Sequence, residues 1–256
     1  MSQPNLTAIG TIARREVTRI LRIWGQTLVP PAITMTLYFL IFGSLIGSRI
    51  GPMDGVGYMD FIVPGLVMMS IIQNAYGNIS SSFFGAKFGR HVEELLVSPM
   101  PNWVILGGYV SGGVLRGLMV GVIVLGIAML FTTVRIPHPL ITIATVVLGA
   151  VIFSLAGFVN AVYAKKFDDI AIVPTFILTP LTYLGGVFYS VTLLPDWAET
   201  ATHFNPIFYM VNAFRYGLLG QSDVSMTMAF GLMGVFVVGL GALALWLLKR
   251  GVGLRS

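Results

Sequence analysis

The sequence predicts an all-α membrane protein that crosses the bilayer six times and forms a single domain over residues 1–256. Three observations support this fold class. Hydrophobic residues make up 56% of the chain and charged residues only 10%, whereas a soluble domain carries about 25% charged residues. Several apolar runs reach the length of about 20 residues that a membrane helix needs. Finally, the basic residues gather on one side of these runs.

The apolar runs indicate where the chain crosses the membrane. Backbone polar groups cannot stay unpaired in hydrocarbon, so runs of this length are expected to be helices. Strands of a membrane barrel are about 10 residues long and alternate in polarity, and these runs do not alternate. The predicted transmembrane helices cover residues 26–47, 61–84, 103–132, 140–163, 170–188 and 226–248.

The basic residues predict the orientation. Six spans place both termini on one side, and that side collects eleven lysines and arginines. The other side collects three, Arg49, Arg135 and Arg215. Because loops rich in lysine and arginine stay in the cytoplasm, both termini are expected to be cytoplasmic.

The segment before the first span, residues 6–24, is amphipathic. On a helical wheel one face is apolar and the opposite face carries arginines: Ile9, Ala13, Val17, Ile20 and Trp24 against Arg15, Arg19 and Arg22. This pattern predicts a helix in the cytoplasmic interface with its arginines toward the lipid headgroups. The alternative is a solvated helix packed on protein.

A short charged segment, residues 87–98, separates the second and third spans. It carries Lys87, Arg90, Glu93 and Glu94 and is stopped by prolines at positions 99 and 101. Since proline interrupts a helix, the segment predicts a short amphipathic helix on the cytoplasmic side. A solvated loop helix without a partner is the alternative.

Residues 190–220 are too polar for a span and too apolar for an open loop. We expect two short helices that form a re-entrant hairpin in the outer interface, where aromatic rings are favoured. Gly185 and Gly186 would loosen the end of the fifth span, and the Asn205–Pro206 pair would break the hairpin. Tyr209 would pass the mouth of an outer gate and Arg215 would lie near water. An ordinary folded external loop is the alternative.

Arg116 is the one charge near the middle of a predicted span. A central arginine costs about 2.5–3.5 kcal/mol on insertion scales. One interpretation places it at a translocation path or a subunit interface. The other makes it a structural arginine bonded to helix carbonyls or to a polar neighbour.

The chemistry missing from the sequence narrows the function. There is no cysteine, so a thiolate metal site and a cysteine nucleophile are excluded. The three histidines lie in three separate loops, which disfavours a shared metal site. None of the four lysines follows a glycine, so the chain lacks the G-x-x-x-x-G-K-[ST] loop that holds ATP phosphates. No acidic residue lies in the middle of a span, whereas ion-coupled carriers usually need buried carboxylates.

Several stretches together resemble a known family. They are QTLVPPAITMTLYFLIFGSLIGSRIG, YMDFIVPGLVMMSII, SSFFGAKFGRHVEELLVSPMP, FDDIAIVPTFILTPLTYLGGVFYSVTLLP and NPIFYMVNAFRYG. The combination of E-E-L-L-x-S-P, L-G-G-V-F-Y and N-P-x-x-Y-x-x-x-x-R is the specific part. Over essentially its whole length the chain resembles the ABC-2-type transporter permeases.

The resemblance implies a partner and a function. It implies six-span subunits that pair as homodimers, and a coupling helix, here residues 87–98 with Glu93 and Glu94, that docks onto a separate ATPase present in two copies. That partner would bind ATP and Mg²⁺, while this chain would hold no cofactor and would not be an enzyme. The pair would export a lipid-like, glycolipid or drug-like substrate across the bacterial inner membrane. Membrane lipids are expected to surround the chain, and no nucleic acid is expected to bind.

Two other classes stay open on the residues alone. One is a secondary carrier or channel that works without an ATPase, and the missing mid-span acids argue against the carrier. The other is a membrane-embedded enzyme that modifies lipids, and the absence of clustered His, Asp, Glu or Ser at one depth argues against it.

Overall fold

The computed structural model describes residues 3–53 and 55–253, and the secondary structure of these residues is helical apart from one isolated bridge between Met53 and Val56. The α-helices, in chain order, are α1 (Gln3–Arg22), α2 (Trp24–Thr27), α3 (Val29–Tyr38), α4 (Gly47–Ile50), α5 (Tyr58–Phe88), α6 (His91–Val97), α7 (Asn102–Ala128), α8 (Pro139–Tyr163), α9 (Asp169–Val173), α10 (Thr179–Tyr183), α11 (Asp196–His203), α12 (Pro206–Leu219) and α13 (Met226–Arg250). Two π-helical segments, Phe39–Ile46 and Pro174–Leu178, continue α3 and α9, and Val191–Leu193 forms a 3₁₀ turn.

Four of the described helical stretches are long and apolar enough to cross a membrane: Trp24–Ile46, α7, α8 and α13. They fall on four of the six predicted spans and confirm an all-helical, polytopic membrane protein. The second predicted span lies within the longer but more polar α5, and the fifth lies in Asp169–Tyr183, a shorter apolar helix. The count of six spans therefore stays a prediction.

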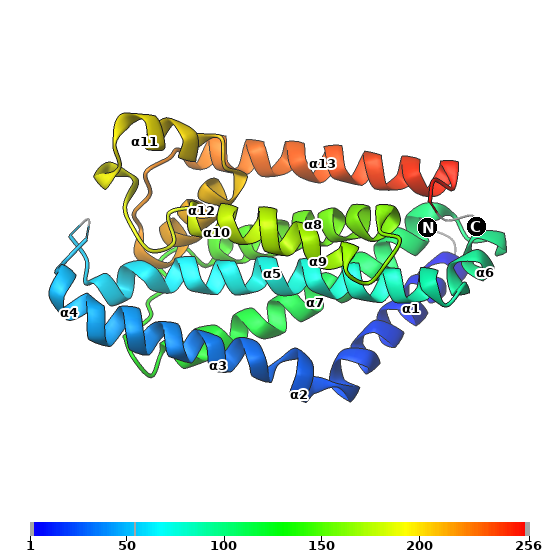
Figure 1. Cartoon of the computed structure of the whole chain (residues 1–256), viewed down its shortest axis with the longest axis horizontal. Helices are drawn as coiled ribbons and strands as arrows, with labels where there is room; N and C mark the ends of the chain where they lie inside the picture. Colours follow the sequence, from blue (N-terminus) through cyan, green and yellow to red (C-terminus); the bar gives the residue numbers. More distant parts are fainter. Residues whose placement is uncertain (1–2, 54, 254–256) are drawn as a thin grey trace.

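Helix α5 forms the centre of the bundle, where it packs against both α7 and α8 (Figure 1). Glycines make this close packing possible. A Cβ added to Gly117 would lie 3.1 Å from the Cβ of Ala75, and one added to Gly157 would lie 2.5 Å from the carbonyl oxygen of Tyr76. Gly117 of the third span and Gly157 of the fourth are thus points of close contact with α5.

The two ends of the bundle carry different elements. Both termini and α6 lie at one end, and α4 and α11 lie at the opposite end (Figure 1). We call these the terminal end and the hairpin end. The positive-inside pattern of the sequence assigns the terminal end to the cytoplasm.

A sharp bend at α2 separates α1 from α3, so that α1 crosses the bundle obliquely (Figure 1). Its cause lies in the sequence, where Pro30 and Pro31 stand in the first turn of α3. Neither proline has an amide hydrogen, so the carbonyls of Gln26 and Thr27 lose the donors that a continuous helix would supply. The chain bends where these bonds are missing.

Two helices end earlier than the expected spans. Helix α7 ends at Ala128 rather than at 132, because the chain closes into turns in which Leu130 and Phe131 donate to the carbonyls of Ile127 and Ala128. The fifth apolar helix ends at Tyr183 rather than at 188. Gly186 follows with φ +72°, a conformation that ends a helix and that glycine adopts without strain.

Candidate functional site

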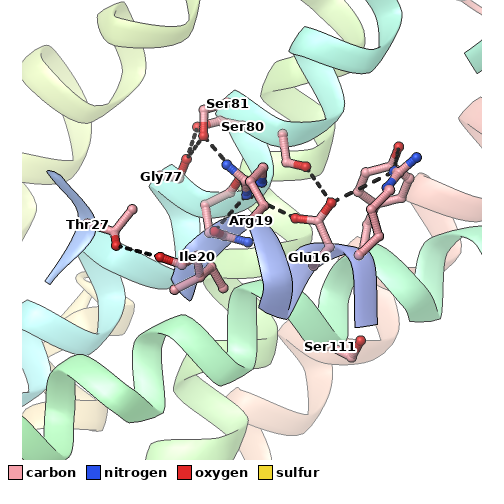
Figure 2. Close-up of polar contacts among 12 residues, drawn as sticks. Glu16, Arg19, Ile20, Thr27, Gly77, Ser80, Ser81 and Ser111 are labelled. Carbon is pink, nitrogen blue, oxygen red and sulfur yellow. Dashed lines mark hydrogen bonds and ion pairs between the residues drawn. The ribbon is translucent and has the colours of Figure 1, made fainter. Parts of the chain in front are cut away.

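A buried charged network joins α1 to α5 and α7 (Figure 2). Its centre is Glu16, whose side chain is only 1% exposed. Arg19 Nη2 lies 2.9 Å from Glu16 Oε2, and the Ser82 hydroxyl donates to Glu16 Oε1 at 2.6 Å. The carboxylate therefore has a donor on each oxygen, as a buried charge requires.

The two arginines beside Glu16 extend the network to the neighbouring helices. Arg19 Nη2 also donates to Asn78 Oδ1 on α5 at 2.8 Å, and Arg15 Nη2 donates to the Tyr109 hydroxyl on α7 at 2.6 Å. A buried ion pair adds little net stability, but it costs several kcal/mol to leave one partner alone. The network therefore fixes where α1 sits on the bundle.

Helix α1 reaches this position because α7 presents glycines to it. A Cβ added to Gly108 or Gly112 would come within 2.6 Å of Ile12 and Glu16, respectively. These two glycines are four residues apart, and so are their partners on α1, which is the spacing of one helix face.

The expected orientation of α1 needs correction. The buried stripe is centred on Ile12, Glu16 and Ile20, and Arg15 and Arg19 bind protein groups instead of pointing only to headgroups. The physical reason is Glu16, which draws both arginines inward by charge. Sequence reasoning missed Glu16, although its place between Ile12 and Ile20 on one face was a usable signal.

Arg116 on α7 lies beside the bend between α2 and α3. Its Nη2 is 3.5 Å from the carbonyl oxygen of Thr27. That carbonyl is one of the two that lose their helical donors, because position 31 is a proline. This contact is of the kind expected if Arg116 is a structural arginine bonded to helix carbonyls, the second of the two interpretations of this residue.

A second carbonyl freed by a proline meets a polar side chain in the apolar helix Asp169–Tyr183. Pro174 removes the amide that would bond the carbonyl of Ile170, and the Asn160 side chain of α8 donates to that carbonyl at 3.3 Å. In both places a polar side chain from a neighbouring helix compensates for a proline. This is how an interrupted helix is tolerated at membrane depth.

The residues expected at the ATPase end lie together at the terminal end. Glu93 and Glu94 are exposed in the first turn of α6, and Arg90, with φ 59°, makes the reverse turn into it. Lys87 still belongs to α5. Its ammonium donates to the carbonyls of Val162 and Ala164 at 2.6 and 2.7 Å, so it caps the C-terminus of α8.

The loop that follows α8 is held by Asp169. The backbone amides of Lys165 and Lys166 donate to its carboxylate at 2.7 and 3.0 Å. These two hydrogen bonds hold the pKa of Asp169 below its ordinary value, since they favour the charged form.

The hairpin residues gather at the opposite end. Asn205 accepts from the Ile207 amide at 3.0 Å and donates to the carbonyl of Leu181 at 2.6 Å, so it caps α12 and ties it to α10. The Tyr209 hydroxyl donates to the His203 carbonyl at 2.9 Å and closes α11 onto α12. Pro206 is the first residue of α12, where its missing amide costs nothing.

The expectation that Arg215 lies near water is wrong. Only 3% of the surface of Arg215 is exposed. Its Nη2 donates to the Gly186 carbonyl at 2.6 Å, and its guanidinium carbon lies 3.9 Å from the ring centre of Phe61. Helix α12 packs against α5 and α8, so one face of it is core and Phe208 and Tyr209 are buried there. Gly185 completes the contact, because a Cβ at this position would come within 3.0 Å of Ile207.

The predicted site residues thus form two groups and one isolated member. Lys87, Arg90, Glu93 and Glu94 lie at the terminal end, and the six hairpin residues lie at the other. Arg116 sits between them on α7. The charged network around Glu16 was not predicted. It joins α1 to the C-terminal half of α5, and this half leads into α6.

The comparisons with known proteins agree with this architecture. The family model of the ABC-2 type transporter matches residues 7–219, and the chain belongs to this family. It is a transport permease of the inner membrane, the membrane component of a transporter rather than its catalytic ATPase.

Individual relatives are similar to it over nearly the whole chain. The inner membrane transport permease YadH of Escherichia coli K12 is 58% identical over 249 residues, which cover 97% of each chain, and YadH of Shigella flexneri matches to the same extent. Nodulation protein J of Sinorhizobium fredii is 23% identical over 84% of this chain and 82% of its own length.

Proposed function

We propose that this chain is the membrane-spanning subunit of an ATP-driven exporter, and that two copies of it work with two copies of a separate ATPase. The observation that carries the proposal is α6. It is a short helix with exposed acidic residues that projects at the end of the bundle holding both termini (Figure 1). The chain has no phosphate loop of its own, so ATP and Mg²⁺ would be bound by the partner.

The surface around α6 supports docking of a protein. Phe88 and Phe167 are 65% and 55% exposed, their ring centres are 5.2 Å apart, and Val97 is 87% exposed. Apolar side chains at a cytoplasmic surface mark a protein interface when they are grouped and rimmed by charge. Here the rim carries both signs of charge, with Glu93 and Glu94 on α6 and Arg90, Lys165 and Lys166 close to the two rings in sequence. A basic groove on the ATPase would complement the two glutamates.

The membrane-facing surfaces support pairing of two subunits. The stretch Trp24–Ile46 exposes Ile33, Leu37 and Ile41, which lie on one helix face. The Tyr38 and Tyr183 hydroxyls, 2.5 Å apart, join this stretch to α10, and the adjoining segment exposes Phe176 and Ile177. We propose that a second copy covers this combined face, and that a lipid-like, glycolipid or drug-like substrate passes between the copies.

The hairpin is proposed to close the outer side of that path. The cap at Asn205, the bond from Tyr209 and the turn at Gly186 give α11 and α12 a fixed position at the end opposite α6. A rigid hairpin of this kind can act as a gate only if the bundle moves under it. We therefore place the moving part in the helices that lead to α6.

Reversing the charge of α6 tests the proposal. We expect the double variant Glu93→Lys and Glu94→Lys to lose most co-purification with the ATPase and most stimulated ATP hydrolysis. Either single change should lose part of it, because one exposed ion pair contributes only about 0–1 kcal/mol. The readouts are pull-down yield and ATPase activity in membrane vesicles.

Glu199→Lys is the matched control, since Glu199 is exposed on α11 at the hairpin end. It makes the charge change of either single variant far from α6 and should leave both readouts unchanged. Full yield and activity in the double variant would refute docking through these charges.

A further inference from the structure

A cavity of ≈ 680 Å³ opens at the hairpin end between α5, the loop from α7 to α8, and the end of α12. Its lining is mostly apolar, with Val63, Pro64 and Leu218 among the walls, and it holds one acidic and one basic side chain, Asp60 and Arg135. This size and this mixture are those of a small-molecule site.

The two charged side chains differ in how firmly they are held. Asp60 lies in the first turn of α5 and accepts a hydrogen bond from the Thr132 hydroxyl, which fixes one of its oxygens. Arg135 is an exposed residue in the loop, so its guanidinium is free to turn toward a ligand in the cavity. The site therefore offers a fixed carboxylate and a mobile guanidinium.

A second, apolar cleft of ≈ 180 Å³ follows the same helices deeper into the bundle. It is lined by Val67 and Ile71 of α5, by Phe214 of α12 and by residues of α7 and α8. Val67 is four residues beyond Val63, and Phe214 four residues before Leu218, so each pair shares a helix face about 6 Å apart. Thr142 is a polar residue of the lining, and its hydroxyl donates a hydrogen bond to the carbonyl of His138 at 3.0 Å.

The surroundings place the cavity at the level of the bilayer surface. Leu130 and Leu140, at the two ends of the loop that carries Arg135, are 81% and 82% exposed. Side chains of this kind contact lipid in a membrane protein. A ligand can therefore enter from the bilayer and keep its polar part beside Asp60 and Arg135.

From these features we infer that the cavity and the cleft together bind one phospholipid with a zwitterionic headgroup from the outer leaflet. Its ammonium would lie at Asp60, its phosphate at Arg135, and one acyl chain in the cleft between α5, α7 and α8. An anionic lipid would satisfy Arg135 but would leave Asp60 facing a negative headgroup. The inference does not rest on ATP-driven export, because it concerns binding alone.

The test is native mass spectrometry of the purified protein in detergent, titrated with phosphatidylethanolamine or, separately, with phosphatidylglycerol. We expect wild type to retain more phosphatidylethanolamine. Asp60→Asn should lower retention of phosphatidylethanolamine only, and Arg135→Gln that of both lipids, by about twofold to fivefold, the range for a partly exposed ion pair. Glycerophosphoethanolamine, which has the headgroup without chains, should compete poorly.

A pair of tryptophan variants tests the cleft. Val122 lines the cleft and is 71% exposed, and Val238 is 72% exposed on α13 and lines neither cavity. Val122→Trp should lower binding of both lipids, whereas Val238→Trp should not. Equal retention of both lipids in wild type, or unchanged binding in Asp60→Asn, Arg135→Gln and Val122→Trp, would overturn the inference. Since ATPase docking is not measured, failure here leaves the proposed function untouched.

Discussion

At the scale of single residues, two polar side chains of the bundle contact carbonyls that have lost their helical donors to proline. Arg116 lies beside the Thr27 carbonyl that Pro31 frees, and Asn160 bonds the Ile170 carbonyl that Pro174 frees. An unpaired carbonyl in hydrocarbon costs several kcal/mol, so these side chains are tolerated despite their own cost of burial.

A double-mutant cycle tests this role for Arg116. Pro31→Ala returns an amide to the Thr27 carbonyl, so Arg116→Met should destabilise the wild-type protein more than it destabilises the Pro31→Ala variant. Because hydrogen bonds in membrane proteins couple by about 0.6 kcal/mol on average and at most about 1.7, the expected coupling free energy is in this range. Thermal unfolding in one detergent measures it.

The control for this cycle is Arg14→Met, which removes an exposed arginine of α1 and should show no coupling to Pro31→Ala. Strict additivity of Arg116→Met and Pro31→Ala would mean that Arg116 does not serve the Thr27 carbonyl. A stable Arg116→Met protein that has lost transport would instead support the interpretation at a translocation path.

At the scale of elements, the hairpin is held by one asparagine that works in two directions. Asn205 caps α12 through its oxygen and holds the Leu181 carbonyl through its nitrogen. Sequence reasoning anticipated the break at the Asn205–Pro206 pair. It could not foresee the bond to Leu181, because that partner lies 24 positions away in the chain.

Two substitutions at this position separate the two bonds. Asn205→Ser keeps an N-cap acceptor but is too short to replace the donor to Leu181, and Asn205→Ala loses both. Losing an N-cap costs about 1 kcal/mol, so thermal stability should fall in the order wild type, serine, alanine. Hydrogen exchange at the first turn of α12 should rise only for alanine. Equal stability of all three proteins would show that neither bond holds the hairpin.

At the scale of the whole molecule, the apolar face shared by the first span and α10 is expected to be covered by a second copy. The chain has no native cysteine, so a single cysteine reports on this face without background. Cysteine at Leu37 or Ile177 should form disulfide-linked dimers on mild oxidation in membranes. Both side chains are 51% exposed in the single chain, so both are accessible to a second copy.

Cysteine at Val235, 68% exposed on α13, is the matched control and should stay monomeric. Crosslinking at Val235 with none at Leu37 and Ile177 would move the dimer interface to α13. Absence of dimers at all three positions, with a monomer in native mass spectrometry, would refute the homodimer.

The sequence by itself determined the class of protein and the positions of the main helices, and it predicts the side of the membrane for each loop. These properties follow from local composition, because apolar length and lysine and arginine placement act through the bilayer and not through specific partners. Resemblance over the whole chain added the family.

Only the tertiary structure decided where the charged residues act. Glu16, Arg19 and Asn78 form a network, and Arg215 is buried, because helices distant in sequence meet there. The glycines of α7 allow this by letting α1 and α5 approach its two sides. The partner of a charge inside a membrane protein is set by such packing, whose contacts join residues tens of positions apart and leave no local pattern in the sequence.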